Sequence, residues 1–218
     1  VIYAQMCNPA GGIECDLTIT RLAEAHFYIV TGAGFGTHDA DWIRRHLPDD
    51  AHLVEVTSAR AVINICGPKA RDVLAAVAEE NVSKAAFPFA TAQDITLGAA
   101  PVRAVRIGFV GELGWELHVP TEFARHVYDL LKAAGAEHGI RDVGYRAIES
   151  LRLEKGYLYW SADISPDYSP IEAGLGFRVH LKRGGDFVGR EVLAAQRAQG
   201  VVRRLCTFTA DTRLPMFG

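Results

Sequence analysis

The fold is decided by the stretch Phe109-Val110-Gly111-Glu112-Leu113-Gly114-Trp115-Glu116. Its glycines separate two runs rich in apolar and β-branched residues, 102–110 and 115–119, which predict two strands. Glu116 stands beside an aromatic residue in the second run. A carboxylate there needs a partner, because its desolvation alone is costly. A planar ligand rich in N–H groups would be such a partner, and Arg106 or Arg152 is the structural alternative.

Strands and helices surround this stretch without regular alternation. Further strand-like runs are at 14–20, 26–30, 53–57, 61–66, 93–97 and 201–209, and the first two predict a hairpin. Helices are predicted from Thr37 or Asp39 to about Leu47, from Gly67-Pro68, from Thr121 to Gly135, from Asp142 to Gly156, and over about 189–198. The segment 157–174 is long for a structureless loop and is therefore a candidate site. The class is α+β, with mixed or antiparallel sheets and helices in two lobes.

Composition excludes several classes of function. The 218 residues are 49% hydrophobic and 22% charged, with a net charge of -3 and a mean hydropathy of +0.07. No basic stretch supports a nucleic-acid surface, and no apolar run reaches the roughly 20 residues of a membrane helix. The four cysteines form no C-x-x-C pair, which favours buried, reduced thiols over disulfides or a metal site. We expect an intracellular protein that binds no metal.

The segment 8–16 is denser in glycine and acidic residues than folding requires. A Gly-Gly turn there leads into a strand in which Asp16 would share a face with Thr18 and Thr20. The structural alternative is a solvated carboxylate close to a turn.

Two later segments have the same character. The segment 150–157 ends a helix, and its structural alternative is a set of surface pairs in which Glu149 and Glu154 neighbour Arg and Lys. The other begins at Trp160 and continues through 170–176. No segment is decisive alone. The residues and the order of the four segments, 8–16, 109–116, 150–157 and the one that begins at Trp160, are informative together.

In this order, the four segments resemble the folate-binding aminomethyltransferase family. That family includes the T-protein of the glycine cleavage system and the folate domains of sarcosine dehydrogenase, dimethylglycine dehydrogenase and dimethylglycine oxidase. The resemblance extends from about Ile2 to Phe208. Within the family, Leu-Arg-Leu-Glu-Lys-Gly-Tyr at 151–157, followed by Trp160, resembles the dehydrogenase branch.

The resemblance implies roles for three charged residues. Asp16 matches the catalytic carboxylate of the family. Glu116 matches the acid that binds the N–H groups of the pterin ring, and Arg152 matches an arginine of the folate pocket.

The resemblance also implies roles for less polar residues. Phe109 stands where the family often has tyrosine, so it can pack against the ligand but has no hydroxyl to donate. Trp160 and Tyr159 are expected as pocket walls. Thr31 is expected at the pocket as well. Thr31-Gly32-Ala33 also resembles the dehydrogenase branch, since the T-protein tends to carry asparagine near this position.

The implied reaction is a one-carbon transfer. A flavin dehydrogenase domain or subunit, whose FAD is bound outside this chain, oxidises an N-methyl amine to an iminium. Tetrahydrofolate then takes up the carbon as methylenetetrahydrofolate, and an ionised carboxylate such as Asp16 stabilises positive charge and can accept a proton. The partners are therefore a folate, an amine-derived iminium and a flavin unit, in the cytoplasm or in the mitochondrial matrix of a eukaryote.

The resemblance also predicts how the chain is organised. The family unit normally has further sequence before Val1 and a small β-barrel after Gly218, so we expect 1–218 to be an incomplete unit. One lobe is expected over 61–150, and the other from 1–60 paired with 151–210.

Several alternatives remain open at this point. Gly32-Ala33-Gly34-Phe35-Gly36 follows a strand and opens a helix, as in a dinucleotide-binding module, although the sixth position is Thr37 instead of glycine or alanine. A non-catalytic folate-binding domain would use the same pocket. A glycine-cleavage aminomethyltransferase or a folate-dependent demethylase is possible within the enzyme class.

Overall fold

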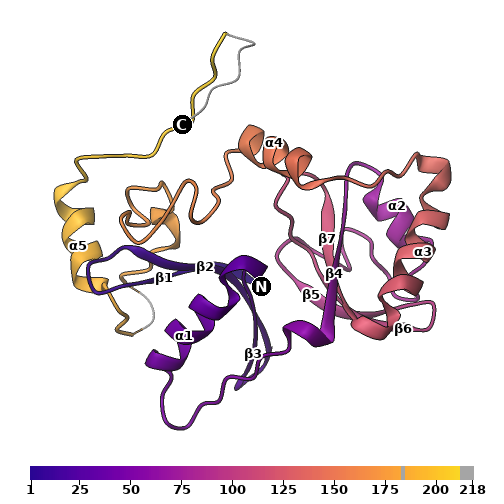
Figure 1. Cartoon of the computed structure of the whole chain (residues 1–218), viewed down its shortest axis with the longest axis horizontal. Helices are drawn as coiled ribbons and strands as arrows, with labels where there is room; N and C mark the ends of the chain where they lie inside the picture. The colour runs from indigo at the N-terminus through magenta and orange to yellow at the C-terminus, as the bar shows by residue number, and fades with distance from the viewer. Residues whose placement is uncertain (183–184, 212–218) are drawn as a thin grey trace. The chain divides into compact units, whose positions relative to one another are not determined.

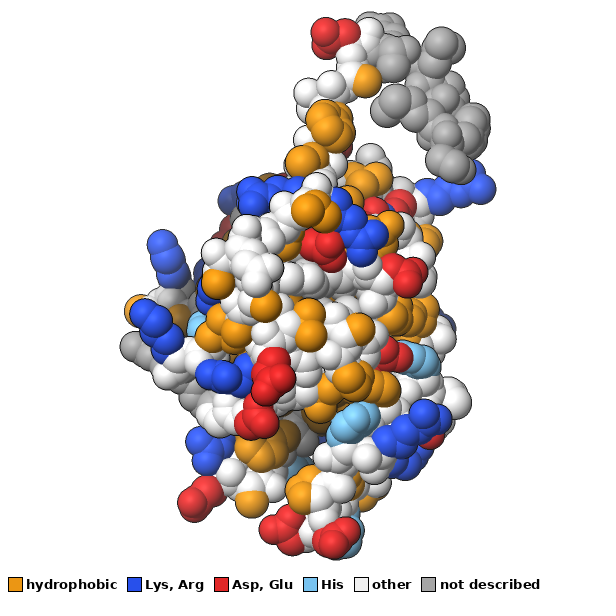
Figure 2. Space-filling view, turned by 90° about the vertical axis from the view of Figure 1, so that its left-hand side faces the viewer, with side chains coloured by type: hydrophobic (Ala, Val, Ile, Leu, Met, Phe, Trp, Pro, Cys, Tyr) orange, Lys and Arg blue, Asp and Glu red, His pale blue; other side chains and the backbone are white. Residues whose placement is uncertain are grey.

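A computed structural model describes residues 1–182 and 185–211. The chain forms two compact units. The first unit comprises Val1–Ala4 and Cys15–Tyr159, and the second comprises Gln5–Glu14 and the chain from Trp160 onward. Within the described residues, no helix combines the length and apolarity needed to cross a bilayer. On the face drawn in Figure 2, Lys and Arg side chains are interspersed with acidic and hydrophobic ones.

A four-stranded antiparallel sheet organises the first unit, with the strand order β4-β7-β6-β5. Its strands are β4 (Arg60–Cys66), β5 (Ala92–Leu97), β6 (Ala100–Val105) and β7 (Gly114–Pro120). The helices α2 (Ala70–Ala75) and α3 (Ala124–Ala134) cover one face (Figure 1). The predicted strands around the glycine-rich stretch are therefore confirmed, except that β6 ends at Val105.

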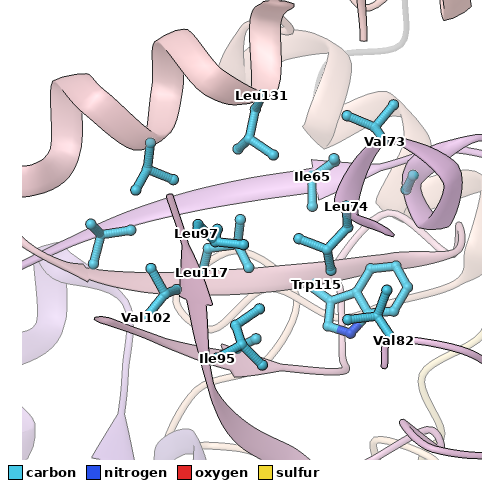
Figure 3. Close-up of a cluster of buried hydrophobic side chains, with 14 of the residues drawn as sticks. Ile65, Val73, Leu74, Val82, Ile95, Leu97, Val102, Trp115, Leu117 and Leu131 are labelled. Atoms are coloured by element: carbon cyan, nitrogen blue, oxygen red, sulfur yellow. The ribbon is translucent and has the colours of Figure 1, made fainter. Parts of the chain in front are cut away.

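The hydrophobic core lies between this sheet and its two helices. Leu117 from β7, Leu74 from α2 and Leu131 from α3 meet there and are each at most 3% exposed (Figure 3). The buried indole of Trp115 contacts the ring of Phe87 edge-on, at 5.9 Å between centroids. Because β-strand side chains alternate, the opposite face of β7 is left for polar residues.

The strands β1 (Ile2–Cys7), β2 (Ile13–Ala23) and β3 (His26–Val30) form a second sheet in that order. The predicted hairpin is confirmed, because β2 pairs antiparallel with β3. The odd-numbered residues of β2 from Ile13 to Leu17 are buried, whereas Asp16 and Thr18 are half-buried. The helix α1 (Gly36–His46) follows β3, after a short 3-10 turn at Ala33–Phe35.

The helix α4 (Tyr145–Lys155) ends at Gly156 as predicted, with that glycine in the left-handed conformation at φ 72°. The predicted start of this helix at Asp142 is wrong. Asp142 accepts hydrogen bonds from the side chains of Tyr128 and Lys132, and the residue before α4 is Gly144. The start of this helix is therefore set by its surroundings and not by a side-chain cap.

The second unit is built around the turn at 8–12 and the irregular segment after Trp160. Asn8 stabilises the turn through two hydrogen bonds to Gly12. Its side-chain Oδ1 accepts from the Gly12 backbone N–H at 3.0 Å, and its backbone N–H donates to the Gly12 carbonyl at 2.9 Å. The unit also contains α5 (Arg190–Gln199), whose Leu193 packs with Cys7 and Val179.

Further 3-10 turns in the described chain are Thr57–Ala59, Thr121–Phe123, Ala136–His138 and Gly176–Arg178.

Two predicted strands are wrong. The runs 53–57 and 201–209 form no strand in the described chain; Val54 is 74% exposed and Phe208 83% exposed, so both apolar runs lack a neighbouring strand. In the two compact units, residues 15–60 group with 61–150. The β2–β3 hairpin contacts the four-stranded sheet of this unit through the Tyr28 and His118 side chains.

Candidate functional site

The candidate site begins on the face of β7 that points away from the hydrophobic core. Trp115, Leu117 and Val119 alternate into the core, so Glu116 and His118 share the other face. The His118 side chain is only 1% exposed, and the Glu116 side chain is 20% exposed. The sequence thus places two titratable groups next to each other on a surface that is largely closed.

A tyrosine from β3 contacts this pair. The hydroxyl of Tyr28 lies 3.1 Å from Nδ1 of His118, and the two rings meet edge-on at 84°. On the other side of the imidazole, Nε2 lies 3.6 Å from a Glu116 carboxylate oxygen. Burial raises the pKa of Tyr28, the guanidinium groups of Arg60 and Arg103 lower it, and Glu116 raises it.

Asp16 lies on the same face of the β2–β3 hairpin as this tyrosine, four residues before Thr20 in β2. Thr20 lies directly opposite Tyr28 in the β2–β3 ladder, so the two side chains share a face. Because strand residues two apart point the same way, Asp16 and Thr18 lie on that face too, as predicted. At Tyr28, this face of the hairpin contacts the β7 face that holds Glu116 and His118.

Aromatic rings gather at the glycine-rich loop and the end of α4. Phe109, 36% exposed, stacks on Tyr157 at 6.3 Å and lies 6.4 Å from Tyr159. Phe35 meets Tyr159 edge-on at 6.0 Å. This cluster offers half-exposed ring faces within the first unit.

Arg152 has a different environment from the surface pair that the sequence suggested. Its side chain is buried, donates to the Tyr157 carbonyl at 3.0 Å and to the Glu149 carboxylate, and lies 5.8 Å from the Tyr159 ring. The pairing with Glu149 agrees with the alternative suggested by the sequence, but Arg152 is buried and does not lie at the surface. Arg152 ties the end of α4 to the segment that carries Tyr159.

Trp160 and Thr31 are held by backbone and side-chain contacts. Trp160 belongs to the second unit, where its Nε1–H donates to the Ile13 carbonyl at 2.9 Å. The Thr31 hydroxyl donates to the Asp39 carboxylate. These contacts give both residues a structural role.

The structure identifies a different partner for Glu116 from the two that the sequence suggested. The Arg106 guanidinium stacks on the Trp115 ring at 4.8 Å, and Arg152 is paired with Glu149. The partner is His118, which sequence reasoning missed. Its signal was the spacing, because a histidine two residues after a glutamate in a strand must share its face.

A model of the GCVT N-terminal domain matches residues 1–183, which is most of the chain. The chain belongs to this family. Human mitochondrial sarcosine dehydrogenase is 42% identical over 233 residues, covering 100% of this chain and 25% of that protein. The mitochondrial pyruvate dehydrogenase phosphatase regulatory subunit of mouse is 34% identical over 97% of this chain and 24% of its own length. This GCVT N-terminal domain thus spans about a quarter of these relatives.

A solved structure supports the same assignment. The glycine cleavage system aminomethyltransferase T from Bartonella henselae matches with a TM-score of 0.78 and 28% identity, over 91% of this chain and 53% of that one. The dinucleotide alternative is wrong for this GCVT N-terminal domain, because the strand before Gly32 is one arm of an antiparallel hairpin. A dinucleotide fingerprint needs a parallel βαβ unit.

One group of side chains has the residue types of a metal site. Donor atoms of Cys15, His38 and Asp39 lie within 4.8 Å of one another. The Asp39 oxygens already accept from the Thr31 hydroxyl and face His38 Nδ1 at 2.9 Å, and Cys15 is fully buried. These contacts account for the group by side-chain packing.

The face around Glu116 suits a flat ligand with N–H donors. A half-buried carboxylate accepts such hydrogen bonds strongly. The His118 Nε2 beside it is buried and has no hydrogen-bond partner within the described chain. The residues present therefore fit the pterin part of a folate.

Proposed function

We propose that this chain forms the folate-binding part of a tetrahydrofolate-dependent one-carbon transferase of the sarcosine or dimethylglycine dehydrogenase type. The observation that supports it most is the meeting of two faces, one with Asp16 and one with Glu116, through the Tyr28–His118 contact. Glu116, proposed to recognise the ligand, and Asp16, proposed to take part in the chemistry, thus both belong to the first unit.

Glu116 and the aromatic cluster would hold the ligand. The Glu116 carboxylate would accept N–H groups of the pterin, while Phe109 and Tyr159 would supply apolar ring faces. Arg152 would act indirectly, by holding the segment that carries Tyr159. Trp160 and Thr31 remain proposed pocket residues whose contacts here are structural.

Asp16 would carry out the chemical role. Tetrahydrofolate, when bound, supplies the ring nitrogens that receive the one-carbon unit. A carboxylate near developing positive charge stabilises it and can take up a proton. Asp16 is half-buried on β2, so it combines access with a partly desolvated setting that strengthens such an interaction.

The remainder of the proposed reaction lies outside this chain. The relatives named sarcosine dehydrogenase are about four times as long as the matched region. We therefore propose that a flavin unit with FAD supplies the iminium from an N-methyl amine. The mitochondrial relatives support the matrix as the location in a eukaryotic source.

Calorimetry with folinic acid tests the binding role in the whole natural polypeptide that contains these residues. We expect Glu116→Gln to weaken binding more than about tenfold, since it replaces a charged acceptor. Glu112→Gln is the matched control, because Glu112 is exposed in the adjoining loop and should bind like wild type. Equal binding by Glu116→Gln and wild type would refute the folate pocket.

The Asp16→Asn variant tests the chemical role. We expect folinic acid binding within about threefold of wild type, and one-carbon transfer lowered by about 10²–10⁴, the usual contribution of a general base. Transfer at the wild-type rate would exclude Asp16 as the catalytic carboxylate.

A non-catalytic folate-binding domain is the second candidate. It is favoured by one relative whose name describes a regulatory subunit, at 34% identity. The two candidates differ in a single measurement: a binding domain would bind folinic acid with the Glu116 dependence above but transfer no one-carbon unit.

A further inference from the structure

We infer that His118 is a positioning residue for Glu116, and that it holds one carboxylate oxygen so that the other is presented to the ligand. This inference rests on the proposed function, because it assumes that Glu116 accepts N–H groups of a folate. The contacts that carry it are Tyr28 to Nδ1 at 3.1 Å and Nε2 to Glu116 at 3.6 Å.

The contacts of the imidazole select one tautomer. The Tyr28 hydroxyl can either donate to Nδ1 or accept from it. If it accepted, the lone pair of Nε2 would face the Glu116 carboxylate, which is repulsive. If Tyr28 donates, the proton lies on Nε2 and points toward the carboxylate, so this is the favoured arrangement.

Burial restricts the orientation of the His118 imidazole. His118 is 1% exposed, and its Nε2 has no hydrogen-bond partner within the described chain. A buried donor without a partner is costly, so the Nε2–H should shorten its 3.6 Å contact when Glu116 is ordered by a ligand. Tyr28 is itself braced by Arg103, whose guanidinium lies 5.4 Å from the tyrosine ring and pairs with Asp94 at 2.9 Å and 3.0 Å.

A histidine suits this role better than an arginine. An arginine forms two parallel hydrogen bonds to a carboxylate and would occupy both oxygens as well as neutralise the charge. An imidazole donates to a carboxylate through a single N–H and leaves the second carboxylate oxygen available to the ligand. The arginine directly opposite His118 in the ladder, Arg103, is already paired with Asp94.

A double-mutant cycle in the whole natural polypeptide tests the inference, with folinic acid affinity as the readout. We expect His118→Leu to weaken binding by about 10- to 100-fold, the value of one hydrogen bond to a charged group. His118→Gln should stay within about twofold of wild type, because its amide can donate from the place of Nε2. In a Glu116→Gln background, His118→Leu should add less than about twofold.

Each contrary outcome is informative. If His118→Leu weakens binding equally in both backgrounds, the residue acts through general structure and the inference is overturned. If it binds like wild type while Glu116→Gln weakens binding, the inference alone fails. If Glu116→Gln has no effect, the proposed function fails and this inference fails with it.

A measurement on the unmutated protein keeps the inference testable if His118→Leu does not fold. Nitrogen-15 NMR of the histidine ring should show the proton on Nε2, with Nδ1 unprotonated. Tyr28→Phe, which removes only the hydroxyl, should weaken folinic acid binding about two- to fivefold, because the imidazole loses the hydrogen bond that orients it. A proton found on Nδ1 in the unmutated protein would overturn the inference.

Discussion

Gly12→Ala should destabilise the protein severely, because the turn before Asp16 leaves no room for a methyl group. A Cβ atom on Gly12 would lie 1.7 Å from the carbonyl oxygen of Pro166 and 2.6 Å from its carbonyl carbon. Real Cβ contacts are essentially never shorter than 3.0 Å, so the two backbone segments would have to separate by more than 1 Å. The Pro166 atoms in this contact belong to the backbone, so they cannot rotate away as a side chain would.

The magnitude follows from the bonds that such a separation would break. The Ile13 N–H donates to the Tyr168 carbonyl at 2.9 Å, and the Trp160 indole donates to the Ile13 carbonyl at 2.9 Å. Losing two such bonds costs about 1–3 kcal/mol in all, and overpacking adds about 1–3 kcal/mol. We therefore expect Gly12→Ala to lower the free energy of unfolding by about 2–6 kcal/mol.

The chain supplies a matched control in Gly36→Ala, the same chemical change at the first residue of α1. Gly36 has helical φ and ψ of -54° and -43°, and a Cβ there would meet nothing within 4 Å. This variant should be stabilised by about 0.5–1 kcal/mol, because alanine favours a helix over glycine. The same substitution is thus expected to have opposite signs at the two sites.

Urea unfolding followed by circular dichroism gives the two free-energy changes, and hydrogen exchange locates them. In Gly12→Ala, amides of 5–14 and 160–174 should exchange faster, while those of 92–120 should be unchanged. A loss of less than about 1 kcal/mol for Gly12→Ala, or an equal loss for Gly36→Ala, would refute the steric reasoning.

Two further predictions concern the second unit. Burial raises the pKa of Glu172, but hydrogen bonds from Arg203 and Ser169 outweigh it and lower that pKa below its usual value. The stabilisation by ionised Glu172 is thus present above the pKa of this carboxyl in the unfolded chain, and it is lost as the pH falls through the pKa in the folded chain. Arg203→Gln should therefore lower Tm at pH 7, and this decrease in Tm should disappear below about pH 4. An equal decrease in Tm at both pH values would contradict the linkage. Burial raises the pKa of Cys7 to about 11, so iodoacetamide at pH 8 should label the exposed Cys206 first and Cys7 only after unfolding, as mass spectrometry of peptides can show.

Sequence periodicity identified those parts of the fold in which a local pattern coincides with burial. The alternation in β2 placed Asp16 with Thr18, and the helix that ends at Gly156 was located by a glycine with left-handed backbone. The run 53–57 has the same composition as a strand but forms none, because strand formation depends on a neighbouring strand. Composition alone does not contain that information.

The candidate site was predictable in its residue types and not in its pairings. Glu116 was recognised as a carboxylate in need of a partner, but its partner is His118 and not Arg106 or Arg152. The pairing depends on how the β2–β3 hairpin meets the sheet through Tyr28, a contact between residues 90 positions apart. Such a contact leaves no periodic signal in the sequence.

The choice of partner has a consequence for what the site can bind. A carboxylate paired with arginine is largely neutralised and has little capacity left for a ligand. Glu116 instead meets a buried imidazole, while Arg106 lies against Trp115 and Arg103 pairs with Asp94. Neither of the two expected arginines therefore neutralises the carboxylate. A carboxylate in this state favours ligands with N–H donors and disfavours anionic groups at the same position, so the acidic tail of a folate should be directed away from Glu116.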